Sequence, residues 1–144
     1  MRGFIAVGLL VALAGCATPP GQLKHEDLSW AQYSINAPLP KVYEGLQTNA
    51  RHCGGLIDQY DPKWYPSQDM RSAKIDLYLE GGFGGTSDWV AGIIELESSG
   101  SQTLAKVGIQ NIYSNPVFRK RDWWRPKFAA IVNEIVSGAT PSCE

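Results

Sequence analysis

Three runs of alternating apolar and polar residues constrain the fold of this chain more than any other feature. The runs are joined by the glycine-rich segment GGFGGTSD at 81–88 and by SGSQ at 99–102. A period of two is typical of half-buried strands, and short links between such runs favour antiparallel neighbours. The residues expected to face inward are Ile75, Leu77 and Leu79, then Val90, Ile94 and Leu96, then Ala105, Val107 and Ile109. The runs therefore predict an antiparallel meander of three strands.

A helix is predicted on the N-terminal side of this meander. Its apolar stripe follows spacings of three, four and three residues, as one face of an amphipathic helix does. Pro40 suits the first turn of the helix and Gly54-Gly55 suits its end. The stripe consists of Tyr43, Leu46, Ala50 and Cys53.

A second helix is predicted near the C-terminus, in the segment RDWWRPKFAAIVNEIVSG. Asp122 is the expected N-cap, Pro126 falls within the first turn, and Gly138 ends the helix. The wide apolar face predicts that the helix packs on a core. That face consists of Trp124, Phe128, Ile131, Val132 and Ile135.

Two shorter segments complete the predicted order of elements. SWAQYSINAPLP at 29–40 indicates a short strand that leads through a proline turn into the first helix. Residues 56–60 indicate another strand, which the Asp61-Pro62 and Tyr65-Pro66 pairs are expected to break. This interpretation places Trp64 and Tyr65 in an aromatic loop, of a kind that either binds ligands or covers the end of a sheet.

The first fifteen residues have the layout of a signal peptide. Arg2 supplies a positive start, and residues 4–14 form an apolar run of 11 residues. At about 1.5 Å per helical residue the run covers roughly 16 Å, about half of a hydrocarbon core of roughly 30 Å. It is too short to remain as a membrane span, and its layout matches the apolar core of a secretory signal.

The residues Leu13-Ala14-Gly15-Cys16 resemble the lipobox of bacterial lipoproteins. That resemblance implies cleavage before Cys16 and acylation of the Cys16 thiol, with an ordinary secretory signal or a buried apolar helix as the alternatives. Two or more acyl chains anchor a protein stably to a membrane. The sorting pattern of the family, in which Asp after the cysteine favours the inner membrane, implies the outer membrane here because Ala17 follows.

The lipobox interpretation divides the chain into three parts. Residues 1–15 are the cleaved signal peptide, and residues 16–27 form a lipidated tether whose prolines, glycine and polar residues cannot build a core. Residues 28–144 remain, a length that suits one domain. Without Arg2 the chain has 12 basic and 14 acidic residues, a balance that argues against general nucleic-acid binding.

Three cysteines remain in the mature chain. If Cys16 carries lipid, Cys53 and Cys143 are left as a pair, and in an oxidising compartment two such thiols are expected to form a disulfide. The alternatives are two free thiols, or a metal site with His52, whose ligand set lacks CxxC spacing.

Together these segments predict an α+β fold with (β)-α-β-β-β-β-α order. The expected architecture is an antiparallel sheet of about four strands, with the optional leading strand, and two helices packed on one face. The disulfide would tie the end of the first helix to the tail behind the second. The segment YSINAPLPKVYEGL at 33–46 resembles the opening of helix-grip lipid-binding domains. The resemblance covers about 14 residues, and because this chain has fewer strands it implies no ligand.

The basic and aromatic segment before the second helix is the best candidate for a partner surface. Basic side chains beside tryptophans suit a membrane surface, an acidic partner or an anionic polymer, while the alternative is a solvated loop whose tryptophans enter the core. The candidate residues are Arg119, Lys120, Arg121, Trp123 and Arg125.

No catalytic set stands out in the sequence. GGFGG lacks the phosphate-loop pattern and reads as a hairpin loop, and Glu95 and Glu97 read as one solvated strand face. His25 lies in the tether and His52 lies beside a predicted half-cystine. We therefore expect a non-enzymatic, outer-membrane-anchored periplasmic lipoprotein without a cofactor, which binds a protein or an envelope component. The alternatives are a carrier of a small apolar ligand or lipid, which requires a cavity of a few hundred Å³, and then a hydrolase.

Overall fold

The structure is a computed structural model of the chain, and it describes residues 26, 28–58, 60–79, 89–110 and 122–143. Five strands and two helices follow in the predicted β-α-β-β-β-β-α order. The strands are β1 (Leu28–Ile35), β2 (Asp61–Pro66), β3 (Ser72–Leu79), β4 (Trp89–Ser99) and β5 (Gln102–Gln110). The helices are α1 (Leu39–Cys53) and α2 (Arg125–Ser137). The α+β class and the predicted leading strand are thereby confirmed.

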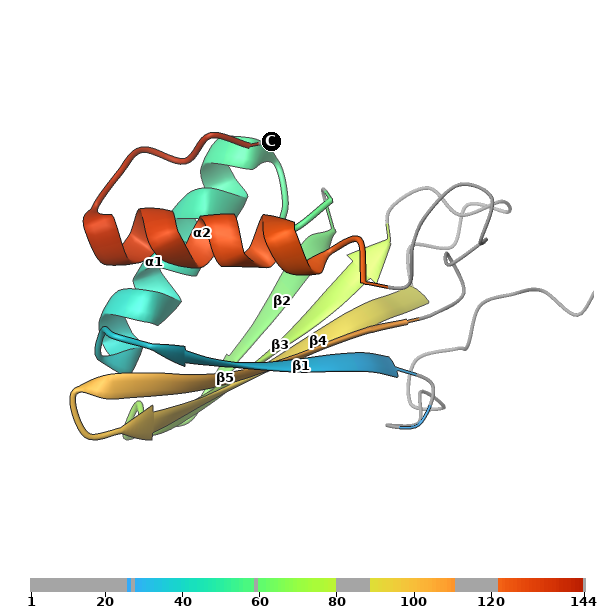
Figure 1. Cartoon of the computed structure of the whole chain (residues 1–144). Coiled ribbons are helices and arrows are strands. Elements are labelled where there is room, and N and C mark those ends of the chain that lie inside the picture. The colour runs from blue at the N-terminus through green and yellow to red at the C-terminus, as the bar shows by residue number, and fades with distance from the viewer. Residues whose placement is uncertain (1–25, 27, 59, 80–88, 111–121, 144) are drawn as a thin grey trace, which may run out of the picture.

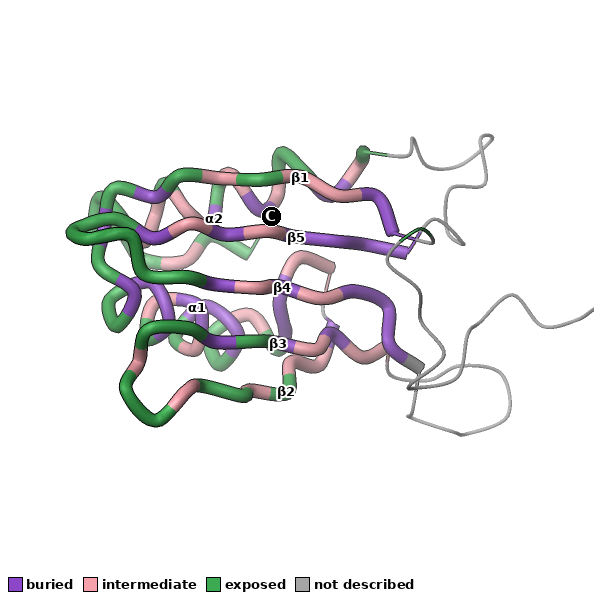
Figure 2. The backbone as a smooth tube through the Cα atoms, turned by 90° about the horizontal axis from the view of Figure 1, so that it is seen from below, coloured by how far each residue is buried: buried purple, intermediate pink, exposed green. Residues whose placement is uncertain are grey.

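The five strands form one sheet in the order β1-β5-β4-β3-β2, and every pair of neighbours is antiparallel. The predicted meander is β3-β4-β5, and β1 adds to its far side. Both helices lie on the same face of the sheet (Figure 1). The opposite face, toward the viewer in Figure 2, has no described helix over it.

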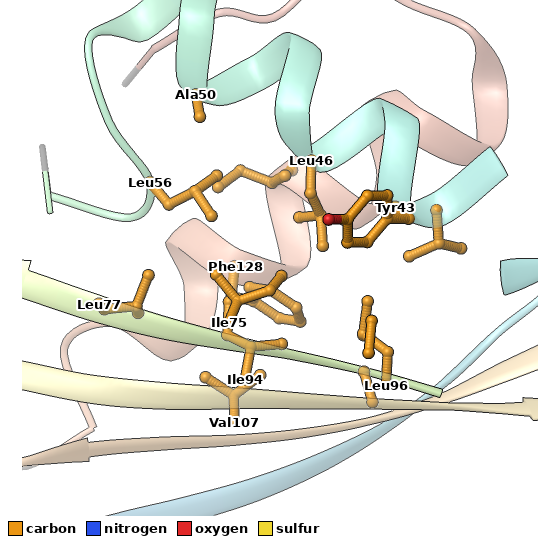
Figure 3. Packing of buried hydrophobic residues seen from close by; sticks show 14 of the residues in the cluster. Tyr43, Leu46, Ala50, Leu56, Ile75, Leu77, Ile94, Leu96, Val107 and Phe128 are labelled. Atoms are coloured by element: carbon orange, nitrogen blue, oxygen red, sulfur yellow. The ribbon is translucent and has the colours of Figure 1, made fainter. Parts of the chain in front are cut away.

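The core lies between the sheet and the two helices. Leu46 from α1, Ile75 from β3, Ile94 from β4 and Phe128 from α2 point into this space and are fully buried (Figure 3). The predicted inward residues of β5 are likewise buried in the same cluster. Burying a large apolar side chain contributes roughly 1.5–3 kcal/mol, so this cluster is the main source of stability.

A register shift between β3 and β4 corrects one predicted inward residue. Leu77 pairs with Gly92 but Tyr78 pairs with Val90, so Ala91 is an extra residue on β4. A bulge of this kind changes the side to which the following side chains point. Val90 therefore shares the side of Tyr78 and lies outside the core cluster, although it is buried. The prediction that Val90 faces inward was wrong.

The prediction of a strand at 56–60 is also wrong, because the strand in this part of the chain is β2, which begins at Asp61. Leu56 and Tyr60 form only an isolated bridge, and the segment DPKWYP is strand β2 rather than a loop. β2 is an edge strand, where proline is tolerated when its nitrogen faces away from the neighbouring strand. Pro62 and Pro66 are four residues apart, so both nitrogens point to the same, unpaired side.

Helix α1 follows the predicted pattern. Its first turn holds Pro40, and Gly54 ends it in the left-handed region at φ 73°. The left-handed conformation strains residues that carry a Cβ atom, which explains glycine at this position. Tyr43, Leu46 and Ala50 are buried on the predicted stripe.

Helix α2 ends as predicted at Gly138 but begins differently. Its N-cap is Trp124, which makes no side-chain capping bond, so the prediction that Asp122 caps the helix was wrong. The carboxylate of Asp122 is instead occupied by Ser29 and Arg125, while its carbonyl oxygen accepts a bond from the Arg125 backbone N–H. A long-range contact thus replaces the expected cap.

The disulfide joins Cys53 to Cys143 across 90 residues of sequence, with their Cα atoms 5.3 Å apart. It ties the last turn of α1 to the tail that follows α2, as predicted. The two helices pack against each other here, and the tail is further held because Ser142 donates to the Glu134 carboxylate at 2.6 and 3.0 Å. Free thiols and a metal site at these cysteines are thereby excluded.

Candidate binding surface

The predicted basic and aromatic surface is only partly described. Arg119, Lys120 and Arg121 lie outside the described residues. Trp123 is half-buried, and its ring centroid lies 6.5 Å from that of Tyr60. The described part of this segment is therefore packed against the domain, and its role as a partner surface stays a prediction.

Arg125 is exposed, yet it makes contacts within the chain. Its guanidinium donates to the carbonyl oxygen of Trp30 at 3.1 Å and lies 3.2 Å from the Asp122 carboxylate. Asp122 in turn accepts a bond from the Ser29 hydroxyl at 3.1 Å. These contacts fix the start of α2 to β1, so the described geometry gives Arg125 a structural role.

Tyr33 lies beside this cluster. Burial raises the pKa of Tyr33; the positive charge of Arg125 acts in the opposite direction, and the negative charge of Asp122 adds to the rise. The ring of Tyr33 packs against Phe128 with centroids 4.9 Å apart. Burial therefore favours the neutral phenol of Tyr33. The contact between Tyr33 and Phe128 links the edge strand β1 to the core.

The two aromatic residues of β2 point to opposite faces of the sheet. The ring of Trp64 contacts that of Tyr43 edge-on, at 5.4 Å between centroids, and packs against the core. Tyr65 is 51% exposed on the other face. Tyr65 is therefore the more exposed of the two, and the segment forms a strand in place of the expected aromatic loop.

The side chains on the open face of the sheet lie in rows that run across the strands. One row across the strands is polar and charged, and the next contains the apolar residues Trp30 and Ile93. Gly108 lies between them, and a Cβ atom there would stand 2.9 Å from the Trp30 indole. The glycine therefore lets the indole lie close to the sheet. The polar row consists of Gln32, Lys106, Glu95, Lys74 and Tyr65.

An open hollow of about 600 Å³ lies where these two rows meet. The indole of Trp30 supplies an apolar surface, the amide of Gln32 both donates and accepts hydrogen bonds, and Lys106 and Glu95 carry opposite charges. Such a mixture suits a partner with apolar and polar groups side by side. The lining residues are Glu26, Trp30, Ala31, Gln32, Glu95 and Lys106.

No local sequence pattern indicates this hollow. The sequence predicts a strand around Trp30 but not the face to which the indole points, because that face depends on the register of β1 against β5. The available signal was the alternation of Trp30, Gln32 and Ser34 with the residues that face the helices. The space that the indole occupies becomes evident only from the pairing of Trp30 with Gly108, which has no side chain.

Two of the smaller spaces lie beside the contact between α1 and α2, and a third, of about 330 Å³, lies between α1 and β2. An open groove of about 240 Å³ runs between α1 and α2, and a space of about 70 Å³ lies beneath the C-terminal tail beside the disulfide. Asn49 lines both of these first two spaces and is 4% exposed. These two spaces are outside the core, whose interior among the described residues is filled by side chains.

The candidate catalytic features do not come together. Among the described ranges, no three His, Cys, Asp or Glu residues are grouped as a metal site. His52 is exposed on α1, whereas Glu95 and Glu97 share the open sheet face as predicted. GGFGG and His25 lie outside the described residues. No helix in the described part of the chain is long and apolar enough to span a membrane.

Comparison of the chain with protein-family models, with curated proteins and with solved structures finds no match. The candidate site therefore stands on the geometry of the open face.

Proposed function

We propose that the chain is a lipoprotein of the bacterial outer membrane whose periplasmic domain binds a protein or an envelope component without catalysis. The anchoring part rests on the sequence of residues 1–16 and on Cys16 as the acylated residue. Acyl chains on Cys16 would hold the first strand, which begins at Leu28, near the bilayer. The disulfide is consistent with an oxidising compartment.

The hollow on the open sheet face carries the binding part of the proposal. An indole beside an amide and two opposite charges combines an apolar contact area with polar groups that set orientation. The hollow is open rather than enclosed, so it suits a surface of a larger partner better than a small molecule. Trp30 is the expected anchor, with Gln32 and Lys106 as its polar neighbours.

The carrier alternative has less support. It requires an apolar cavity between sheet and helices, where Leu46, Ile94 and Phe128 fill the described core. The groove between α1 and α2 has an apolar wall at Ile135 but is open to solvent.

Site-specific photo-crosslinking in intact cells tests the binding face. A photoreactive side chain at Lys106, inside the hollow, is expected to give a defined adduct with one protein or with cell-wall material. The matched control is the same side chain at Lys41, on the helical layer. Trp30→Ala should reduce the adduct from position 106 while the purified variant keeps its thermal transition. No adduct from position 106, or equal adducts from both positions, would refute the proposed face.

A further inference from the structure

A buried amide without a partner lies between the two helices. Asn49 of α1 is 4% exposed, and within the described ranges its side chain makes no hydrogen bond. The hydroxyls of Ser29 and Thr103, two other buried polar residues, each donate to an acceptor in the chain. A buried polar group without a partner lowers the free energy of unfolding, so Asn49 is unfavourable for the fold alone. The Asn49 amide is therefore available to pair with a ligand.

The Asn49 side chain opens into two spaces. It lines both the space of about 70 Å³ beside the disulfide and the groove of about 240 Å³ between the helices. Glu134 of α2 also lines both, so the two spaces adjoin along the contact between α1 and α2. The tail behind α2 passes back toward the end of α1 (Figure 1), and its residues Ser142 and Cys143 form part of the wall of the smaller space.

The two ends of this combined site differ in charge. Lys127 lines the smaller space, and its ammonium lies 3.8 Å from the Asp58 carboxylate. Glu44 lines the groove at the other end, where it is exposed and makes no ion pair among the described residues. Lys41 lines the groove too, but its ammonium donates to the Val136 carbonyl oxygen at 3.5 Å. The order of groups along the site is thus positive, amide, negative.

We propose that this site binds a free dipeptide, whose charged ends and central amide follow the complementary order. The N–H and the carboxylate of an extended terminal residue lie on the same side of the backbone. The Asn49 amide can therefore accept from the peptide N–H through Oδ1 and donate to the terminal carboxylate through Nδ2. The carboxylate then lies toward Lys127, and the ammonium of the first residue lies toward Glu44 and Glu134. These matched charges fix one orientation of the dipeptide.

The size of the smaller space favours a terminal residue with a small side chain. A water molecule needs about 10–15 Å³ of such volume, so a space of about 70 Å³ admits a terminal residue but not a continuing chain. Ile57, Ala130 and Ile131 give this space an apolar wall, which suits a side chain the size of a methyl group. Alanyl-alanine is therefore the appropriate probe.

An NMR titration of the mature, disulfide-bonded chain with alanyl-alanine tests the proposal. We expect saturable shifts of the Asn49 side-chain amide, with a dissociation constant of about 1 mM or tighter. Asn49→Leu keeps the branched shape without a donor or acceptor, so it should raise the dissociation constant about tenfold or more. The same variant should not lower the thermal midpoint, because it removes an unpaired polar group from the interior. The matched control is Gln47→Leu, the same change on α1 beside the separate space next to β2, which should leave binding unchanged.

Two modified probes test the orientation. N-acetyl-alanyl-alanine lacks the ammonium and alanyl-alanine amide lacks the carboxylate, so each should bind about threefold or more weakly. Glu44→Gln should weaken the binding of alanyl-alanine but not of its acetylated form, in which the ammonium is already absent. This comparison assigns the ammonium to the end of the site at Glu44.

A titration without saturation would overturn the proposal and would leave water as the partner of Asn49. A dissociation constant that Asn49→Leu leaves unchanged would also overturn it. Equal binding of alanyl-alanine and its acetylated form would contradict a free dipeptide and would indicate the end of a longer chain. Photo-crosslinking from Lys106 reports on the other face of the sheet, so failure here is distinguishable from failure of the proposed binding face.

Discussion

The guanidinium of Arg125 donates to the carbonyl oxygen of Trp30 at 3.1 Å, across 95 residues of sequence. The first residue of α2 is thereby fixed to the edge strand β1 beside the hollow. The same guanidinium pairs with Asp122, which also bonds Ser29. The contact explains how the last helix is placed relative to the first strand, and it makes the start of α2 sensitive to single substitutions.

Arg125→Ala should lower the free energy of unfolding by about 1 kcal/mol, because it removes one hydrogen bond and a partly solvated ion pair. Arg125→Lys keeps the charge near Asp122 but loses the forked geometry, so a smaller loss is expected. Urea denaturation measures both. Arg71→Ala, which removes an exposed ion pair with Asp69, is the control and should change stability by less than about 0.5 kcal/mol. Equal effects at both positions would contradict the structural role of Arg125.

The contact between the helices is equally specific. A Cβ atom at Gly45 would lie 2.7 Å from Cγ1 and 2.8 Å from Cγ2 of Ile135. Gly45→Ala should therefore destabilise the protein by about 1–3 kcal/mol through overpacking, despite the better helix propensity of alanine. In a double-mutant cycle, Ile135→Ala should recover part of this loss, because it makes room for the new methyl group. Strictly additive effects would show that the helices are not in contact here.

Stability should fall in alkaline solution, in part because of Tyr33. Burial raises the pKa of Tyr33 in the folded protein, whereas the unfolded chain has an ordinary tyrosine pKa of about 10. The unfolded state then loses its proton first, so the stabilisation is complete below about pH 10 and is lost as pH rises through the folded pKa. Tyr33→Phe keeps the ring contact with Phe128 and should flatten the decline measured by urea denaturation between neutral and alkaline pH. An unchanged decline would contradict the contribution of Tyr33.

The disulfide should make a large contribution to the free energy of unfolding. Closing a loop across 90 residues stabilises a fold by about 4–5 kcal/mol in the chain-entropy model. Cys143→Ser should lower the unfolding free energy by an amount of this order, and reductant should have the same effect on the unsubstituted protein. Reductant should have no further effect on the variant. Alkylation of Cys53 or Cys143 in the native protein without reductant would contradict the bridge.

The sequence was sufficient to predict those helices and strands whose pattern involves only residues close together in the chain. The alternation around Ile75 and Val107 predicted strands, and glycines at 54 and 138 predicted the ends of the helices, because each depends on residues only a few positions apart. The disulfide followed from counting cysteines once Cys16 was set aside. These features locate the elements along the chain without placing them in the sheet.

The features that the sequence did not predict depend on distant partners. Pro62 and Pro66 indicated a break because proline disrupts most strands, and only the position of β2 at the edge makes them acceptable. Asp122 has the chemistry of an N-cap, but Ser29 and Arg125 occupy its carboxylate. The hollow beside Trp30 required the register between β1 and β5, which no local pattern specifies.

The proposed function depends on acylation of Cys16, which metabolic labelling with a radioactive fatty acid measures. The chain should incorporate label and fractionate with outer membranes, whereas Cys16→Ser should abolish the label and release the protein from the membrane fraction. Ala17→Asp should keep the label and move the protein toward the inner membrane. A Cys16→Ser chain that remains membrane-bound, or an original chain that takes up no label, would contradict the account.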